Sequence, residues 1–363
     1  MSKLSNIIFV GELPPHTITG VSISNKINIE ILKSKFHVTI VEEYYLINKH
    51  DKISLSKAIN FLKTYLNYLS LIVKKKYNFY YGVIYLSKFG ILKNISTILL
   101  FKIFNYKKTV VLHFHRSDFS LFLKNKIAFY LFQFLNLFVD KYILLSPVQI
   151  NDFSFNNLNK LNLLYNTIED EPYFVKSECI GPIKIIYLGN FIISKGVYEL
   201  IESYLILRKS YDITLDFYGA FASNDLRLKL LNLIEPYNDI KLHGDIRGLM
   251  KMDVLVNSDL IILPSYNEGL PLVLLESMYC GLPVIISNVG YIRDALGEDY
   301  PLYCEAKNVQ SIIKSFENFF ETKDSIDYSS MLKSLYNKFS KKNHIQQLLK
   351  IFQYENFDNN SSI

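Results

Sequence analysis

The stretch "SYNEGLPLVLLESMYCGLPVIIS", which runs from Ser265 to Ser287, decides the fold of this chain. It is apolar almost throughout, yet it carries two carboxylates, Glu268 and Glu276, eight positions apart. The run "LIILPS" just before it reads as a buried strand, "LVLLESMY" as a helix and "PVIIS" as a second strand. A strand, a helix and a strand in this order indicate a parallel βαβ unit.

The same alternation extends over the rest of the chain and predicts an α/β fold of two Rossmann-like, doubly wound units that face each other across a cleft. The expected strands lie at about 6–12, 37–43, 79–87, 108–115, 141–146, 183–190, 213–219, 240–244, 260–265 and 283–287. The expected helices lie at about 21–35, 55–76, 90–105, 121–139, 196–210, 225–234, 249–257 and 271–279.

We therefore expect a first domain over 1–165, a polar linker over 166–182 and a second domain over 183–342. The tail, about 343–363, is expected to be helical and to pack back on the first domain.

The charge of the chain is divided unevenly between its two halves. The 363 residues have a net charge of +6, but residues 1–150 hold 20 Lys and Arg against 7 Asp and Glu, whereas the remainder holds 20 against 27. A basic, aromatic-rich first half is suited to an anionic membrane face or a phosphorylated acceptor. The alternative is that the lysines are only the solvated residues of this composition. The chain holds no nucleic-acid motif.

Three cysteines, Cys179, Cys280 and Cys304, are widely spaced. Neither a disulfide framework nor a zinc site is expected, and a reducing cytoplasm is the simpler context. We expect no signal peptide. The longest apolar run, Ile127 to Val139, falls short of the roughly 20 residues that cross a bilayer and is expected to be a buried or interfacial helix. The expected location is the cytoplasm, with peripheral contact at the inner face of the membrane as an extension of it.

The two carboxylates lie where a doubly wound sheet binds its ligand. Glu268 is expected in the loop past the carboxyl end of a strand, and Gly269 allows the backbone to approach a ligand. Pro271 suits the start of the helix, whose positive end then points into the cleft. Glu276, in the second turn, can accept two hydrogen bonds from a vicinal diol such as a ribose. The structural alternative is a salt-bridged Glu276 and a helix-capping Glu268.

The segment "PSYNEGLPLVLLESMYCGLPVIISNVG" resembles the signature of the group 1 family of retaining, nucleotide-sugar-dependent glycosyltransferases, which have the GT-B fold. The resemblance implies that Glu276 holds the ribose of the donor and that Glu268 binds the donor sugar. It also implies that Gly269, Leu270 and Pro271 line the donor site.

The resemblance extends to three further segments of the second half. "YLGNFIISKGVYELIES" is similar to the family's phosphate-binding loop, so Lys195 would contact the donor diphosphate. Asn190 stands where the family often has Arg, which leaves Lys195 as the main cation. Gly244, in "KLHGDIRGLMKMDVLVNSDL", would lie at a turn near the nucleobase. Asn166, in "LYNTIE", would correspond to an interdomain asparagine.

In the first half, "VVLHFHRSDF" is similar to the family's histidine-containing loop. His115, together with His113, would approach the donor sugar and the acceptor, and Arg116 departs from the Gly that often follows. Gly20 is what remains of a glycine-rich loop on the acceptor side. Without the resemblance, a structural role would be the usual expectation for each histidine.

The resemblance implies retaining transfer of a hexosyl group from a nucleotide diphosphate sugar to a hydroxyl of a glycan acceptor, expected to be lipid-linked, in surface polysaccharide or lipopolysaccharide biosynthesis. No cofactor and no metal is expected, because the chain lacks an Asp-x-Asp motif. Two alternatives stay open: a nucleotide-sugar 2-epimerase of the same fold, and a non-catalytic protein that binds sugar nucleotides. The departures at Asn190 and Arg116 motivate the second.

Overall fold

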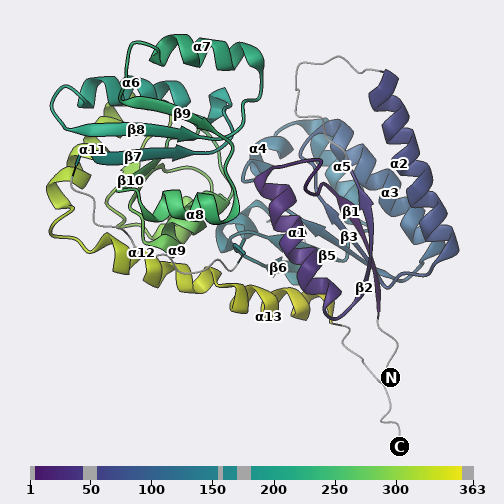
Figure 1. Ribbon diagram of the computed structural model, residues 1–363. Helices are drawn as coiled ribbons and strands as arrows, with labels where there is room; N and C mark the ends of the chain where they lie inside the picture. The colour runs from purple at the N-terminus through teal and green to yellow at the C-terminus, as the bar shows by residue number, and fades with distance from the viewer. Residues whose placement is uncertain (1–4, 44–54, 154–157, 170–180, 354–363) are drawn as a thin grey trace, which may run out of the picture.

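A computed structural model describes residues 5–43, 55–153, 158–169 and 181–353. These residues form two six-stranded parallel sheets that lie side by side, the first in purple and blue and the second in green (Figure 1). The expected α/β class with two doubly wound units is therefore confirmed. The first sheet has the order β2-β1-β3-β4-β5-β6 and contains β1 (Asn6–Gly11), β2 (His37–Glu42), β3 (Phe79–Val83), β4 (Thr109–His113), β5 (Lys141–Leu144) and β6 (Leu161–Leu163).

The two faces of the first sheet bury alternate residues of each strand, as the period of two of a β-strand requires. In β1, Ile8 and Val10 face a core formed with α2 (Leu55–Lys74), α3 (Lys88–Phe104) and α5 (Lys126–Asn136). Ile7 and Phe9 face the opposite core, formed with α1 (Gly20–Lys33) and α13 (Lys341–Phe352). Helices thus cover both faces of this sheet.

The single helix expected over 121–139 is wrong, because two helices occupy this stretch. They are α4 (Phe119–Leu123) and α5. Asn125 lies between them, and its side-chain oxygen accepts a hydrogen bond from the backbone N–H of Ala128 at 3.2 Å. An Asn that caps a new helix in this way competes with continuation of the preceding one.

The second sheet has the order β12-β11-β10-β7-β8-β9 and contains β7 (Ile183–Leu188), β8 (Ile213–Tyr218), β9 (Ile240–Gly244), β10 (Leu260–Leu263), β11 (Val284–Ser287) and β12 (Tyr303–Cys304). Its helices are α6 (Val197–Leu207), α7 (Asn224–Ile234), α8 (Gly248–Val256), α9 (Leu272–Cys280), α10 (Ile292–Leu296), α11 (Val309–Thr322) and α12 (Tyr328–Tyr336). Pro271 is the N-cap of α9, so the helix begins at Leu272, one residue after the expected start.

Strand β7 lies in the middle of this sheet, between β8 and β10. The chain runs outward from β7 through β8 to β9, and then returns to β10 on the other side. The crevice between β7 and β10 is therefore the topological switch point, where open α/β sheets bind ligands beyond the carboxyl ends of their strands.

Helix α13 passes from the second unit to the first and runs along the lower edge of the molecule (Figure 1). Its residues Leu348, Ile351 and Phe352 are buried in the core beneath α1. Lys141 at the start of β5 donates a hydrogen bond to the carbonyl of Ile351 at 2.6 Å. Most of the expected linker, with Cys179, and the end of the expected tail helix lie outside the described residues. None of the described helices is both long and apolar enough to cross a membrane.

Candidate functional site

A cleft of about 410 Å³ lies between the carboxyl ends of the two sheets. Nine of the eleven site residues predicted from the sequence line it: Gly20, His115, Asn190, Lys195, Glu268, Gly269, Leu270, Pro271 and Glu276. His113 and Gly244 do not line the cleft. His113 is the last residue of β4 and is buried. Gly244 ends β9, and the next three residues, 245–247, line the cleft instead.

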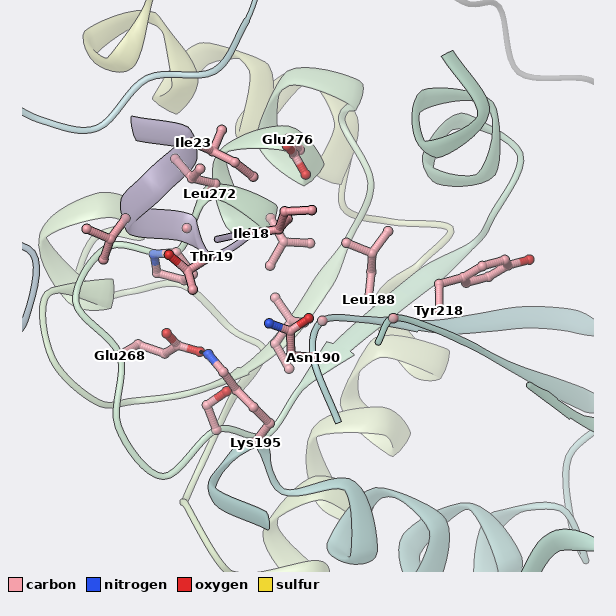
Figure 2. Close-up of a pocket in the computed structure, with 18 of the residues that line it drawn as sticks. Ile18, Thr19, Ile23, Leu188, Asn190, Lys195, Tyr218, Glu268, Leu272 and Glu276 are labelled. Atoms are coloured by element: carbon pink, nitrogen blue, oxygen red, sulfur yellow. Dashed lines mark hydrogen bonds and ion pairs between the residues drawn. The ribbon is translucent and has the colours of Figure 1, made fainter. Parts of the chain in front are cut away.

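Lys195 and Glu268 meet at the switch point of the second sheet. Lys195 follows β7 and Glu268 follows β10, and their Nζ and Oε1 atoms are 2.5 Å apart (Figure 2). Both side chains are largely withdrawn from solvent, with exposures of 27% and 14%. The residue expected to hold the donor phosphates is thus paired with the residue expected to hold the donor sugar.

Gly196 allows this approach. It has φ of 71°, and a Cβ at this position would lie 2.1 Å from the carbonyl oxygen of Pro264. Only glycine fits both the left-handed backbone and the close packing of the β7 loop against the β10 loop. The position of Lys195 therefore depends on the glycine that follows it.

Glu276 lies on the wall of the same cleft, at its opposite side from the Lys195–Glu268 pair (Figure 2). Its side chain is 10% exposed, and its Oε1 is 2.5 Å from Nζ of Lys251 on α8. Lys251 also lines the cleft, although no pattern in the sequence predicts it as a site residue. Lys251 is close to Glu276 because α8 packs against α9, and no local sequence pattern predicts that contact.

The N-terminus of α9 adds positive potential to this cleft. Pro271 provides no side-chain cap, and the first turn of α9 holds no acidic residue. Residues 270–273 line the cleft, so the free N–H groups of the helix end are close to a bound ligand. Such an end favours an anion.

The two histidines of the first unit are packed against each other, with ring centroids 4.0 Å apart. Nδ1 of His113 lies 3.0 Å from the hydroxyl of Tyr81, and the Nε2 atoms of both histidines are buried without a hydrogen-bond partner. Burial lowers the pKa of His115 to about 3 and, together with His115 and His344, holds the pKa of His113 well below its ordinary value. Both rings are therefore neutral at pH 7 and poor proton acceptors.

His344 of α13 connects to the same pair through a buried chain of hydrogen bonds. Its Nδ1 lies 2.7 Å from the carbonyl of Tyr165, and its Nε2 lies 2.7 Å from Oδ1 of Asn28. The amide of Asn28 donates to the hydroxyl of Tyr81 at 2.9 Å, and Tyr81 then meets His113. The helix that crosses between the units is thus joined to the histidines beside the cleft.

The first unit holds the Glu268 loop at three places. Oγ of Ser117 lies 2.8 Å from Oδ1 of Asn267 and 2.5 Å from the carbonyl oxygen of Glu268. Asn166 donates to the carbonyl of Leu270 at 2.8 Å. A Cβ at Gly269 would lie 2.8 Å from the carbonyl oxygen of His115, so glycine is needed for this approach. In contrast, a Cβ at Gly20 would meet nothing within 4 Å.

The remaining predicted residue, Asn190, lies near the centre of the cleft between Lys195 and Leu188 (Figure 2). Its carbonyl accepts a hydrogen bond from the hydroxyl of Tyr187 at 3.1 Å, which fixes the loop after β7. Within the described residues no group of three or more His, Cys, Asp or Glu is arranged to hold a metal ion.

Known proteins that resemble this chain include glycosyltransferases. An O-antigen biosynthesis glycosyltransferase of Escherichia coli, WclY, is 28% identical over 190 residues, which are 49% of this chain and 51% of that protein. A Campylobacter jejuni protein named N,N'-diacetylbacillosaminyl-diphospho-undecaprenol α-1,3-N-acetylgalactosaminyltransferase is 27% identical over 170 residues, 46% of this chain and 43% of its own. The chain spans between about a third and two thirds of the length of the curated relatives it matches.

The solved structure of Anabaena HepE in complex with UDP and glucose has the same fold. It superimposes with a TM-score of 0.68 and 13% sequence identity, and the match covers 96% of this chain and 99% of HepE. The fold is therefore GT-B. Residues 174–347, which include Lys195, Glu268 and Glu276, match the model of the family described as glycosyl transferases group 1. Over these residues the chain belongs to the group 1 glycosyltransferase family.

Proposed function

We propose that this protein transfers a hexosyl group, with retention of anomeric configuration and without a metal ion, from a nucleotide diphosphate sugar to a hydroxyl of a glycan acceptor. The observation that carries the proposal is the arrangement of the second unit's cleft, where two carboxylates lie on opposite walls and each has a lysine beside it. Such a cleft has separate places for a ribose, a diphosphate and a sugar.

Each end of the donor has a residue suited to it. Glu276 accepts hydrogen bonds from the vicinal hydroxyls of the ribose, while Lys195 and the N-terminus of α9 stabilise the diphosphate. When Lys195 turns toward the phosphate, Glu268 gives up its ion pair and accepts hydrogen bonds from the donor sugar. The charge on the departing diphosphate is then stabilised by groups already in place.

In the chemical step, the bond between the anomeric carbon and the phosphate oxygen breaks, and the acceptor oxygen forms its bond on the same face of the sugar. The acceptor proton passes to the leaving phosphate. His115 positions the reacting groups, and its low pKa agrees with a role that requires no protonation. The contacts of Ser117 and Asn166 with the Glu268 loop keep water away from the donor.

The proposed acceptor is a lipid-linked glycan of a surface polysaccharide, and the proposed place of action is the cytoplasmic face of the membrane. The names of the E. coli and C. jejuni relatives refer to O-antigen biosynthesis and to a diphospho-undecaprenol acceptor. The basic first half of the chain suits an anionic lipid surface.

The test is transfer of labelled sugar from a panel of nucleotide sugars to lipid extracts, with Glu276→Ala beside the unchanged protein. We expect Glu276→Ala to lower transfer at least 100-fold, with Glu202→Ala on the exposed face of α6 as the matched control. Glu276→Gln keeps one acceptor oxygen and separates loss of ribose binding from loss of stability. Full transfer by Glu276→Ala would contradict the proposal, and a new sugar isomer formed from donor alone would indicate an epimerase.

A further inference from the structure

One face of the first unit is a layer of three adjacent helices, α2, α3 and α5, which we call the outer helix layer. All three pack their inner sides on the same face of the first sheet, through residues such as Tyr68, Ile98 and Phe132. Helix α3 contacts both α2 and α5. In Figure 1 these helices form the side of the first unit that faces away from α1 and α13.

Helix α5 has a second apolar stripe that faces outward. Its inner side buries Ala128, Phe132 and Leu135. The stripe on the other side consists of Ile127, Tyr130, Phe134 and Leu137, with exposures of 58%, 71%, 45% and 73%. These four positions are spaced by three, four and three residues, so they share one face of the helix. An apolar stripe that faces outward from a helix whose other side is already buried is an unpartnered surface.

The neighbouring helices also expose apolar side chains. On α2, Leu62, Leu66 and Val73 are exposed, and on α3, Phe89 and Ile103 are exposed. The rings of Phe61 and Phe89 lie 6.3 Å apart, so the apolar surfaces of α2 and α3 meet. Exposed apolar residues are normal when scattered singly, whereas a continuous area marks an interaction site.

The three helices of this layer hold lysines but no Asp or Glu, and Asp118 and Asp140 flank the segment that contains α4 and α5. Residues 55–117 contain ten lysines and one arginine but no Asp or Glu. Within the outer helix layer and the turns that join its helices to the chain, the exposed lysines are Lys63, Lys74, Lys75, Lys76, Lys88, Lys107, Lys124 and Lys126. Lysines that surround apolar side chains complement a surface that is both anionic and apolar, as an anionic lipid bilayer is, and a nucleic acid would not need the apolar stripe.

We infer that the outer helix layer docks on the surface of an anionic lipid bilayer. The apolar side chains of α5 and its neighbours enter the boundary between headgroups and acyl chains, and the surrounding lysines contact the lipid phosphates. The inference rests on the proposed function for its purpose, because α5 is connected to His115 by a short segment and docking would keep the cleft beside a lipid-linked acceptor.

Vesicle co-sedimentation tests the inference without any transfer reaction. The full chain is mixed with vesicles of phosphatidylcholine alone or with one-fifth phosphatidylglycerol. We expect binding to the anionic vesicles only, weakened at least tenfold by Tyr130→Ser/Phe134→Ser/Leu137→Ser and by Lys124→Glu/Lys126→Glu. Raising the salt concentration should weaken the electrostatic part of vesicle binding.

The second unit provides matched controls. Leu228→Ser/Leu231→Ser/Leu233→Ser removes three exposed leucines of α7, and Lys209→Glu/Lys241→Glu reverses two exposed lysines. Both controls should bind vesicles as the unchanged protein does. Equal loss in the controls, equal binding to uncharged vesicles, or a dimer in solution that the α5 triple variant dissolves would each overturn the inference.

Donor binding separates this inference from the proposed function. Stabilisation by nucleotide sugars, measured as a shift in melting temperature, should be unchanged in the α5 triple variant. Vesicle binding without donor stabilisation or transfer would overturn the proposed function alone. Transfer to a detergent-solubilised acceptor without vesicle binding would overturn the docking surface alone.

Discussion

The two units of this protein are built alike but charged differently at the cleft. Both have a six-stranded parallel sheet that opens toward the cleft at the carboxyl ends of its strands. Every Asp, Glu, Lys and Arg that lines the cleft comes from the second unit, whereas the preceding part of the chain contributes Ile18, Thr19, Gly20, Val21, Ile23, His115 and Asn166. The charged groups of the cleft are therefore concentrated in the second unit, while the first unit forms a neutral wall.

We expect the largest effect on transfer from Lys195→Ala in the second unit. Because Lys195 is the cation at the switch point, its loss should reduce transfer about 100- to 1,000-fold, comparable to the loss of one preorganised group that stabilises developing charge. Steady-state kinetics with the donor that the panel identifies would measure the effect on kcat and kcat/KM.

Lys209→Ala, at an exposed position after α6, is the matched control and should retain full activity. If Lys209→Ala were equally inactive, or if Lys195→Ala kept a transfer rate within threefold of the unchanged protein, Lys195 would not be the group that stabilises the leaving diphosphate.

Lowering the pH should destabilise the first unit more than the second. His113, His115 and His344 are buried in or against the first unit, and burial lowers the pKa of His115 to about 3 and of His344 to about 4. The unfolded chain protonates these groups near pH 6.5, so their contribution to stability is present above that pH and is lost as the pH falls toward 4. Each group can remove up to about 1.4 kcal/mol per pH unit.

Hydrogen exchange at pH 7 and pH 5.5, corrected for intrinsic rates, would locate the loss. Amides of β1, β3 and β4 should lose protection before those of β7, β8 and β10. His344→Gln, which retains one hydrogen-bonding group toward Tyr165, should flatten the pH dependence. Earlier opening of the second unit would refute the assignment of acid sensitivity to these histidines.

Much of the fold and of the cleft could be predicted from the sequence, because the periodicity of the apolar residues locates the strands and the position of a residue after a strand places it at the cleft. Glu268 and Lys195 each follow a strand with a clear apolar pattern, and parallel strands end at one edge. Strands β6 and β12 are only three and two residues long, which is too short for a strand pattern to be recognised in the sequence. The break between α4 and α5 depends on a single capping asparagine within an apolar run.

Lys251 shows what local patterns lack. It lies on α8, 25 positions before its partner Glu276, and nothing in the intervening sequence reports that the two helices place Nζ 2.5 Å from Oε1. His113 shows the reverse case, a residue that a motif predicts for the site but that does not line the cleft. It shares a motif with His115, but the strand turns its side chain into the interior, toward Tyr81.

Lys251→Met should have a smaller effect than the loss of Lys195. The lysine orients Glu276 and adds positive charge to the cleft, so we expect KM for the donor to rise about tenfold with little change in kcat. Lys251→Arg should restore most of the affinity, because it keeps the charge beside the carboxylate. A fall in kcat alone would instead assign Lys251 to the chemical step.

The smallest expected effect concerns the contact between the units. Ser117→Ala removes a hydroxyl that lies within hydrogen-bond distance of Asn267 and of the carbonyl of Glu268, while the backbone around it is unchanged. A hydrogen bond of this kind contributes about 1 kcal/mol, so we expect transfer to fall about fivefold. Ser210→Ala, in an exposed turn of the second unit, should have no effect. Because the hydroxyl touches the loop and not the cleft, donor hydrolysis in the absence of acceptor should rise relative to transfer if the contact keeps water out. Equal losses of hydrolysis and transfer would mean that Ser117 only stabilises the loop, and the neutral wall of the first unit would then have no part in excluding water.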